Sequence, residues 1–309
     1  LYTVAPMFHI GAMAVATLAI HRGMTNIIDH VFEPGRVWQI IADERIHSTF
    51  LVPAMLNFMA KHEAAWVSGH EALRGVLCGG SPVPASLIEL YAKHGIDIHQ
   101  VYGATENHGG LCMISPEDAL KKAGSTGKPY IGLDVRIVDK SGRDVAPGVP
   151  GEVITRGDHV LKEYWNKPEE THKAFKDGWF YLGDIAEMDD DGFIYIKDRS
   201  KDMIISGGEN VYPAEVEDII LSMDDVLEVA VIGQRSAKWG ESVCAVVVVK
   251  PSSKNAEALV SEIEAHCAEH LARYKRPRAI EFVDEIPRNS TGKALKVVLR
   301  ERFPGPVLE

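Results

Sequence analysis

Three absences narrow what this 309-residue chain can do. Its only cysteines (Cys78, Cys112, Cys244 and Cys267) are far apart and form no Cys-x-x-Cys pair, a pattern that argues against structural zinc and fits a reducing, cytoplasmic setting. No apolar run reaches the ~20 residues that a membrane span requires. No basic block offsets the net charge of −11, which argues against a nucleic-acid partner. What is left is a globular chain long enough for one large domain or two modest ones.

The first 115 residues or so alternate between strand-like and helix-like runs. Strands are predicted at 48–53, 73–78 and 97–102, and helices at 54–62 and 84–94. A strand, a glycine-rich stop, a helix and another strand predict a parallel α/β layer. Ligands of such layers gather at the carboxyl ends of the strands, where Gly79-Gly80-Ser81 and Tyr102-Gly103 fall.

The pattern changes twice after that layer. Residues 125–197 contain short strands of period two at 134–138, 152–156 and 193–197, which predict an antiparallel, barrel-like subdomain. A small α+β module follows, with a helix after Pro213, strands at 227–232, 242–249 and 279–283, and helices at 256–273 and from Ala294. The fold class is therefore α/β, with a partial large domain at 1–198 and a small C-terminal domain at 199–309.

Five short motifs along this framework carry the functional signal. They are Tyr102-Gly103-Ala104-Thr105-Glu106, Tyr181-Leu182-Gly183-Asp184, Asp198-Arg199-Ser200-Lys201-Asp202, Ser206-Gly207-Gly208-Glu209-Asn210 and Pro287-Arg288-Asn289-Ser290-Thr291-Gly292-Lys293. Each motif alone is weak. Their order and spacing resemble the adenylate-forming superfamily, which includes acyl-CoA synthetases, adenylation domains and luciferases. The sequence resembles bacterial AMP-forming fatty-acid–CoA ligases most.

The resemblance implies a set of residues that bind ATP and activate the acid. Glu106 is expected to hold Mg²⁺, which prefers hard oxygen ligands, and Thr105 to contact phosphate. Tyr102 would stack on adenine, with Gly80, Ser81 and Gly103 lining the nucleotide pocket. Asp184 and Arg199 are the expected ribose contacts, an acceptor-only carboxylate being suited to a diol. Lys293 is the expected catalytic cation, which would reach both the acyl carboxylate and the α-phosphate.

The resemblance also implies a second step, in which CoA displaces AMP. Lys201 falls where relatives have a hinge between their two domains, so that Lys293 would leave the site after the first step. Gly207 and Gly208 would then help form the pantetheine tunnel, because adjacent glycines allow close backbone approach. Trp239 would flank that tunnel. The ring of Tyr274 and the cations of Lys275 and Arg276 suit the nucleotide phosphates of CoA.

The sequence identifies the acid substrate less well than it identifies ATP and CoA. Amino-acid-activating relatives place an aspartate where this chain has His9, and an unpaired buried ammonium would be costly, so an amino acid is disfavoured. Gly109 and Gly110 would leave room beside the carboxylate for an alkyl chain. Medium- or long-chain aliphatic acids are the leading expectation, while aryl acids and sterol side chains remain open.

Three other motif interpretations are disfavoured. Thr291-Gly292-Lys293 lacks the upstream glycine and the following Ser/Thr of a Walker loop. Asp189-Asp190-Asp191-Gly192 lacks the ligand spacing and the closing glutamate of a calcium loop, so a hairpin turn is expected. His266-Cys267-Ala268-Glu269-His270 matches an inverted zinc-protease signature. Its histidines flank an apolar helix stripe, however, and no third ligand motif follows.

Several alternatives stay open. The chain could load a carrier protein instead of CoA, oxidise its adenylate as luciferases do, or bind nucleotide without turnover. Relatives carry a Ser/Thr/Gly-rich phosphate-binding loop upstream of Pro6-Met7-Phe8-His9, and this chain begins at Leu1 without it. The sequence is therefore expected to be the C-terminal portion of a longer enzyme. It leaves a homodimer and peripheral membrane association open.

Overall fold

The computed structural model of the chain describes residues 1–66, 69–81, 83–250, 256–289 and 293–305. Serine 290, Thr291 and Gly292 of the C-terminal motif lie outside the described residues. The chain divides into two compact units, one of residues 1–182 and 186–196 and the other of residues 183–185 and 197–309. The division runs through two strands, β11 at Trp179–Met188 and β12 at Ile194–Arg199. The predicted α/β class is confirmed, with one mostly parallel sheet, one antiparallel sheet and a small α+β unit.

The first unit begins with a seven-stranded sheet in the order β2-β1-β3-β4-β5-β6-β7. Neighbours from β2 to β5 are parallel, and β6 and β7 are added antiparallel. Its strands are β1 Tyr2–Thr3, β2 Ile27–Ile28, β3 Ser48–Leu51, β4 Gly75–Gly79, β5 Asp97–Tyr102, β6 Cys112–Met113 and β7 Lys128–Pro129. Its helices are α1 Ile10–Arg22, α2 Pro34–Asp43, α3 Pro53–Lys61, α4 Ala85–Lys93 and α5 Pro116–Ala119.

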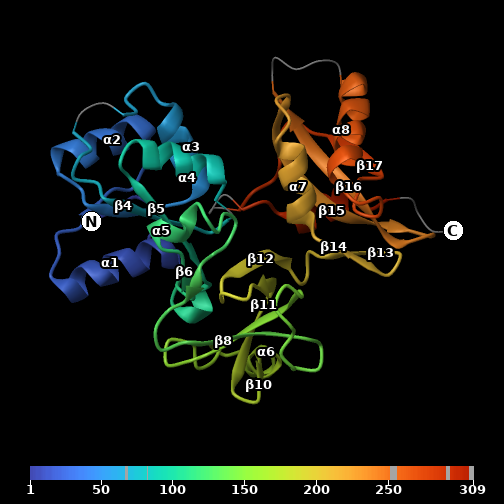
Figure 1. Cartoon of the computed structure of the whole chain (residues 1–309), viewed down its shortest axis with the longest axis horizontal. Helices are drawn as coiled ribbons and strands as arrows, with labels where there is room; N and C mark the ends of the chain where they lie inside the picture. The colour runs from blue at the N-terminus through green and yellow to red at the C-terminus, as the bar shows by residue number, and fades with distance from the viewer. Residues whose placement is uncertain (67–68, 82, 251–255, 290–292, 306–309) are drawn as a thin grey trace. The chain divides into compact units, whose positions relative to one another are not determined.

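Helices cover both faces of this sheet. Figure 1 shows α2, α3 and α4 together on one face and α1 on the other. Alternate residues of β4, Val76 and Cys78, join the core under α2, α3 and α4. Phe50 of β3 points the other way, because a side chain added at Gly11 of α1 would meet the Phe50 ring at 2.6 Å. Burial on both faces explains why β4, Gly-Val-Leu-Cys-Gly, has no polar side chain on either face.

The rest of the first unit contains the antiparallel sheet, ordered β10-β11-β9-β8 with β12 beside β11. Its strands are β8 Asp134–Val138, β9 Gly151–Arg156, β10 Phe175–Lys176, β11 Trp179–Met188 and β12 Ile194–Arg199, and its helix is α6 Pro168–Ala174. The sequence predicts β8 at its observed bounds. It does not predict β11, whose ten residues include Gly183 and mix polar and apolar side chains.

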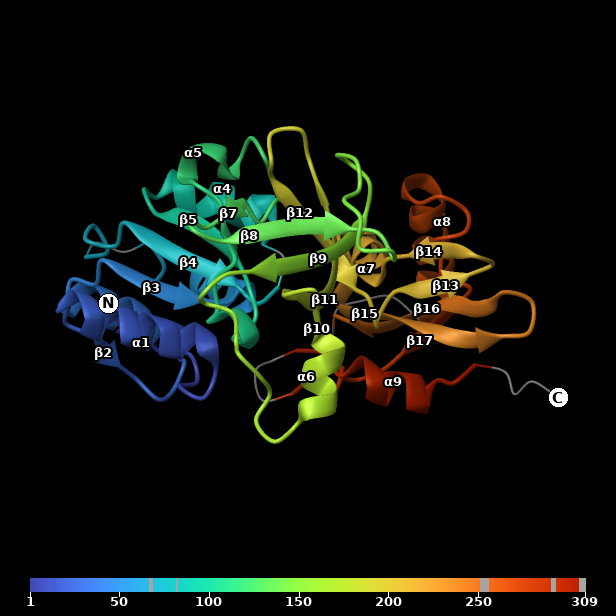
Figure 2. The same cartoon turned by 90° about the horizontal axis from the view of Figure 1, so that it is seen from below.

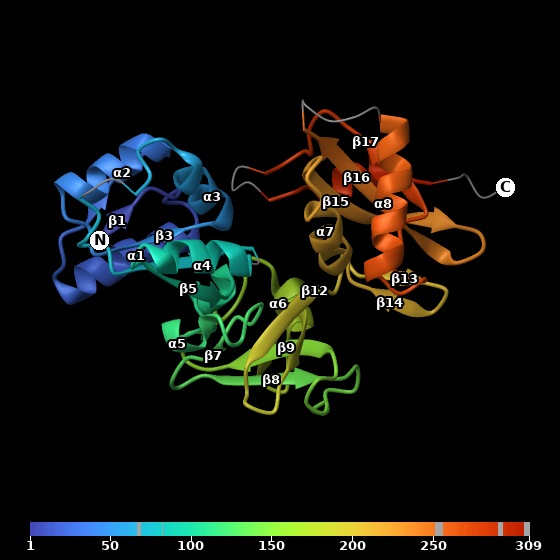
Figure 3. The same cartoon turned by 45° about the horizontal axis from the view of Figure 1, so that its top comes forward.

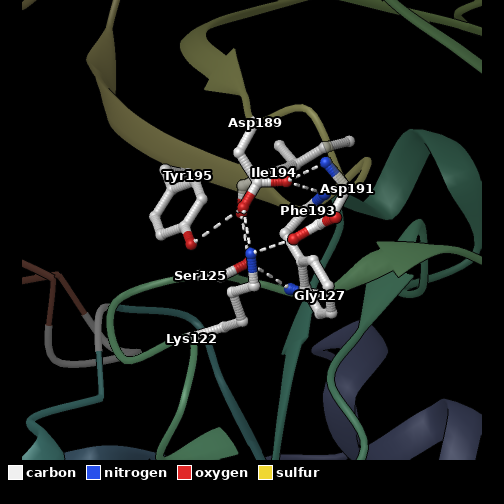
Figure 4. A network of polar contacts seen from close by, with 8 residues as sticks. All are labelled: Lys122, Ser125, Gly127, Asp189, Asp191, Phe193, Ile194 and Tyr195. Atoms are coloured by element: carbon white, nitrogen blue, oxygen red, sulfur yellow. Dashed lines mark hydrogen bonds and ion pairs between the residues drawn. The ribbon is translucent and has the colours of Figure 1, made fainter. Parts of the chain in front are cut away.

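The turn between β11 and β12 is the hairpin that the sequence predicts at Asp191-Gly192. Asp189 closes it by accepting hydrogen bonds from the backbone of Asp191 at 3.0 Å and of Phe193 at 2.9 Å. Its other oxygen accepts from Lys122 Nζ at 2.8 Å, and Lys122 also reaches Asp191 at 2.6 Å (Figure 4). An ammonium therefore sits among the carboxylates that a calcium ion would need.

The same cluster ties the hairpin to the segment before β7. Ser125 Oγ and Thr126 Oγ1 both donate to the carbonyl of Ile194, at 2.9 and 3.1 Å, and Tyr195 donates to Asp189 at 3.3 Å. Desolvation tends to raise the pKa of Asp189. The hydrogen bonds from Lys122 and Phe193 outweigh it and hold that pKa below its ordinary value.

We expect Lys122→Met to lower the Tm by several degrees at pH 7, because two neighbouring carboxylates lose their shared cation. A lowered aspartate pKa stabilises the fold above the unfolded pKa of about 3.9 and ceases to do so as pH falls through the folded value. The difference from wild type should therefore shrink below about pH 4. Thermal unfolding by circular dichroism measures both effects. Lys121→Met, at the exposed neighbouring lysine, is the matched control, and an equal shift in both variants would contradict the prediction.

The second unit is a five-stranded sheet ordered β14-β13-β16-β15, with β17 parallel to β16. Its strands are β13 Ile204–Ser206, β14 Glu209–Val211, β15 Val226–Ser236, β16 Gly240–Val249 and β17 Ala279–Phe282, and its helices are α7 Pro213–Leu221, α8 Ala256–His270 and α9 Lys296–Arg302. Figure 3 shows α7 and α8 over one face, and Figure 2 shows α9 on the opposite side.

Period-two alternation in β15 and β16 builds a core on each face of this sheet. Val231 and Val243 pack under α7 and α8, whereas Ile232 and Cys244 pack with Leu299 of α9. Within the part of the chain described here, no helix has the length and apolarity needed to cross a membrane.

Candidate functional site

The loop after β5 holds the first predicted motif in a tight turn. Tyr102 ends β5 and packs half-buried against the core beside Leu111 and Cys112. Thr105–Asn107 forms one turn of 3₁₀ helix, held by a hydrogen bond from the backbone of Ala104 to Asn107 Oδ1 at 2.7 Å. A side-chain atom added at Gly103 would lie 2.6 Å from the carbonyl oxygen of Gly109. The turn therefore needs glycine at 103.

Glu106 lies half-buried in this turn and is held by a loop from later in the chain. The Tyr164 hydroxyl donates to Glu106 Oε1 at 3.0 Å, and the backbone of Leu161 donates to the Glu106 carbonyl at 2.7 Å. Desolvation, followed by the charge of Glu106, raises the pKa of Tyr164 to about 12. The phenol therefore remains a hydrogen-bond donor across the physiological pH range.

The donor set of this turn fits Mg²⁺. The described residues contain no group of three or more His, Cys, Asp or Glu side chains that could hold a metal ion by themselves. Magnesium usually takes one or two protein carboxylates and completes its shell with water and substrate phosphates. Glu106, with the exposed hydroxyl of Thr105 beside it, supplies that kind of partial, all-oxygen set.

The other predicted residues of the first unit surround this turn and the end of β4. Gly80 follows β4 with φ +89°, a conformation that favours glycine, and Ser81 is exposed. His9 caps α1, its Nδ1 accepting from the backbone of Gly11 at 3.2 Å. The acyl-pocket role of His9 stays a prediction.

Gly109 and Gly110 lie close to neighbouring side chains within this unit. A Cβ at Gly109 would lie 3.0 Å from Ile10 Cγ1, and a Cβ at Gly110 would lie 2.6 Å from the Tyr130 ring. The glycines let α1 and Tyr130 approach the turn closely. Packing therefore accounts for them here, and a direct contact with an acyl chain remains a prediction.

The second unit brings together three residues that are distant in sequence. Asp184 is buried and pairs with Arg199, with 3.0 Å between Oδ1 and Nε. The backbone of Ser200 donates to the Gly183 carbonyl at 2.8 Å, which fixes the two segments side by side. The Lys293 side chain is exposed, yet desolvation of its ammonium and then the charge of Arg199 lower the pKa of Lys293, while Asp184 and Asp202 oppose this effect.

The predicted hinge segment is a compact turn. Asp202 and Met203 both donate backbone hydrogen bonds to the Arg199 carbonyl, at 2.9 and 3.0 Å. The side chain of Arg300, from α9, holds the Asp202 carboxylate at 3.0 Å. Lys201 itself is exposed. Its hinge role stays a prediction.

The glycine pair at 207–208 forms the tip of the β13–β14 hairpin against Trp239. A Cβ at Gly207 would lie 2.8 Å from the Trp239 ring, and the Gly207 backbone donates to the Trp239 carbonyl at 2.8 Å. Gly207 and Gly208 have φ of +62° and +89°. The Arg278 guanidinium and Lys238 Nζ lie over the Trp239 ring, at 4.6 and 4.9 Å from its centroid, so the ring already has two cationic partners.

The predicted cations at 275 and 276 also have partners. Lys275 Nζ contacts both carboxylate oxygens of Glu215, at 2.6 and 2.7 Å. Arg276 donates to the carbonyls of Leu271 and Ala268, at 3.0 and 2.9 Å. Arg276 therefore caps the end of α8, which stops at His270 instead of at the predicted Arg273. Tyr274 lies at the surface.

The histidines of the zinc-like signature have local roles on α8. His266 Nε2 lies 3.0 Å from Ser222 Oγ and 3.2 Å from the Ile219 carbonyl, at the end of α7. His270 Nδ1 lies 2.9 Å from the His266 carbonyl. Both imidazole rings therefore have hydrogen-bonding partners in or next to helices α7 and α8.

Sequence reasoning missed Tyr164, Asn107 and Arg300. Tyr164 and Arg300 act through contacts 58 and 98 positions away in the chain, which no local pattern reports. Asn107 carried a weak signal, since an asparagine in the loop five residues after the end of β5 can hydrogen-bond to nearby backbone and so stabilise a turn.

The mostly parallel sheet, the antiparallel sheet and the small α+β unit together match the fold of adenylate-forming enzymes. Residues 1–165 match the AMP-binding enzyme family, and residues 215–293 match the AMP-binding enzyme C-terminal domain. The chain belongs to this family, within the adenylate-forming superfamily.

Similar proteins include several CoA ligases. The long-chain-fatty-acid–CoA ligase FadD13 of Mycobacterium tuberculosis is 45% identical over 98% of this chain and 59% of its own length. The feruloyl-CoA synthase of an Amycolatopsis species is 41% identical over 97% of this chain and 60% of its own length. The structure of o-succinylbenzoate CoA synthetase from Bacillus subtilis with its acyl-adenylate intermediate is 33% identical, with a TM-score of 0.90 over 99% of this chain and 62% of that one. The chain thus spans about 60% of the length of the curated relatives it matches.

Proposed function

We propose that this chain is the part of an AMP-forming acid–CoA ligase that carries its nucleotide, hinge and CoA-facing motifs. In the first step a carboxylate oxygen attacks the α-phosphorus of ATP, forming acyl-AMP as the bond to pyrophosphate breaks. In the second step the CoA thiol, losing its proton, attacks the acyl carbon and AMP leaves.

The observation that carries this proposal is the ion pair of Asp184 and Arg199, in the same unit as Lys293. Asp184 and Arg199 are 3.0 Å apart and the pKa of Lys293 responds to both. A carboxylate that accepts from a ribose diol, beside two cations, suits a nucleotide whose phosphate gains negative charge during the reaction. Coming from three separate motifs, such a cluster supports an activation site better than any motif does alone.

The first unit would supply the metal and phosphate contacts. Glu106 and Thr105 would hold Mg²⁺ and the phosphates, with Tyr102, Gly103, Gly80 and Ser81 beside the nucleotide. When bound, Mg²⁺ would neutralise phosphate charge. The predicted domains at 1–198 and 199–309, the hinge at Lys201 and the cytoplasmic setting belong to the same proposal.

We propose medium- or long-chain aliphatic acids as substrates. The 45% identity to a long-chain-fatty-acid–CoA ligase supports this class. Other relatives are named for ferulate, 2-succinylbenzoate and indoleacetate, so an aryl acid is the main competitor. His9, in place of the aspartate expected in amino-acid-activating relatives, argues against amino acids.

Mass spectrometry of products tests the function directly. The purified chain is incubated with ATP, Mg²⁺, CoA and a mixed panel of aliphatic, aryl and amino acids. Acyl-CoA and AMP in equal amounts would support the ligase and identify its acid. ATP binding with neither acyl-AMP nor thioester would favour a nucleotide-binding protein without turnover, and CoA-independent acyl-AMP would favour another acceptor.

We expect Trp239→Ala to raise the KM for CoA about tenfold, because it would remove an aromatic contact with CoA worth roughly 1–1.5 kcal/mol. Adenylate formation should be unchanged, since Trp239 would act only in the second step. Pyrophosphate release without CoA and thioester formation with CoA measure the two steps separately. An equal loss in both would contradict the assignment of Trp239 to the CoA step. Trp179→Ala, at a tryptophan of the antiparallel sheet under Arg156, is the matched control.

A further inference from the structure

We propose that Tyr164 is a positioning residue that sets the Glu106 carboxylate for the metal–nucleotide complex. The inference rests on the proposed function, and concerns a residue that none of the five motifs contains. Its starting point is the hydrogen bond of 3.0 Å from the Tyr164 hydroxyl to Glu106 Oε1.

The loop that carries Tyr164 is fastened to the Glu106 turn at the backbone as well. The Leu161 N–H donates to the Glu106 carbonyl at 2.7 Å, and His108 Nδ1 contacts the His159 carbonyl at 2.5 Å. These contacts join residues 106–108 to residues 159–161. The tyrosine therefore approaches Glu106 from a segment that is already in register with it.

Tyr164 is in turn held from the start of α6. Its backbone N–H donates to Thr171 Oγ1 at 2.9 Å, and the Thr171 hydroxyl donates to the Lys167 carbonyl at 2.9 Å. Asn166 between them has φ +54°, which turns the chain sharply after Tyr164. The phenol thus projects from a fixed backbone.

The hydrogen bond from Tyr164 would restrict the rotamers that the Glu106 side chain samples. A glutamate on a half-exposed turn samples several rotamers, and holding it in one costs side-chain entropy. A donor on Oε1 selects one rotamer and leaves Oε2 for the cation. Magnesium demands near-ideal octahedral geometry, and loss of an outer partner of a metal ligand typically weakens metal affinity ~10–100-fold.

The test compares ATP affinity with Mg²⁺ and with EDTA, by equilibrium dialysis without acid or CoA. We expect Tyr164→Phe to weaken Mg²⁺-supported ATP binding about tenfold and to leave binding in EDTA unchanged. In a Glu106→Gln background, Tyr164→Phe should cause no further loss, because the hydroxyl acts through that carboxylate. Circular dichroism checks that each variant is folded.

The matched control is Tyr195→Phe, which also removes a hydroxyl that donates to a carboxylate, Asp189, in the same unit. It should leave both affinities unchanged. Wild-type affinity in Tyr164→Phe with Mg²⁺, or an equal loss with and without Mg²⁺, would overturn the positioning role and leave the proposed function intact. Failure of the wild-type chain to bind ATP more tightly with Mg²⁺ would overturn both.

Discussion

Replacing Lys293 by alanine should reduce acyl-adenylate formation by about 10²–10³-fold, the loss typical when one preorganised donor to a developing anion is removed. The charges of Arg199 and Asp184 both act on the Lys293 ammonium, and in the proposed function that ammonium would face the α-phosphate as negative charge develops there. Thioester formation from added acyl-AMP should be nearly unchanged, because Lys293 would serve only the first step. Pyrophosphate release and thioester formation, assayed separately, measure the two effects.

The control for this substitution is Lys296→Ala on the same segment. Lys296 forms an ion pair with Glu217 at 2.7 Å and has no proposed role in nucleotide binding. Its loss should lower stability and spare adenylation. A Lys293→Ala variant that forms acyl-AMP at the wild-type rate would remove Lys293 from the catalytic set.

The pH dependence of the first step should carry the signature of the same lysine. The pKa of Lys293 is lowered, so its ammonium loses its proton at a lower pH than an ordinary lysine does. The adenylation rate should therefore fall as pH rises through that lowered pKa. In Lys293→Arg the guanidinium stays charged, and this alkaline fall should disappear, even where the rate at neutral pH is reduced.

Much of the fold could be predicted because it depends on local patterns. The bounds of β5 and β8 match the predictions from apolar run length and period-two alternation. Helix α7 begins at Pro213 as predicted, since proline suits the first helical turn. The strand β11 was missed because its sequence begins with four consecutive apolar or aromatic residues, Trp179 to Leu182, followed by a glycine at 183, and so shows no clear alternation.

The candidate site was likewise predictable only where a local sequence pattern identifies the residue. Motif residues that act one by one, such as Glu106 or Lys293, are visible in the sequence because their neighbours are distinctive. The contacts that hold them are not. Tyr164 with Glu106, Arg300 with Asp202 and the Tyr130 ring against Gly110 depend on three-dimensional packing. The same packing brings Ile10 and Tyr130 close to the glycines at 109 and 110, whose expected place beside the acyl chain stays a prediction.

Asp184→Asn should weaken AMP binding about 10–100-fold, because hydrogen bonds to a charged acceptor contribute about 1.5–3 kcal/mol. Asparagine keeps the shape of the side chain and removes the charge that accepts from the ribose diol. It also leaves the partly exposed Arg199 without its anionic partner. Calorimetric titration with AMP measures the affinity. Asp144→Asn, at a surface ion pair with Arg136, is the control and should have no effect, since such pairs are worth little.

The same substitution should move the pH profile of adenylation in a defined direction. The charge of Asp184 raises the pKa of Lys293, in opposition to desolvation and Arg199. With that charge removed, the pKa of Lys293 should fall further, and the alkaline loss of the adenylation rate should begin at lower pH than in wild type. A shift to higher pH, or AMP affinity equal to wild type, would show that Asp184 supports the fold without facing the nucleotide. Both effects together would require Asp184, Arg199 and Lys293 to act as one electrostatic unit.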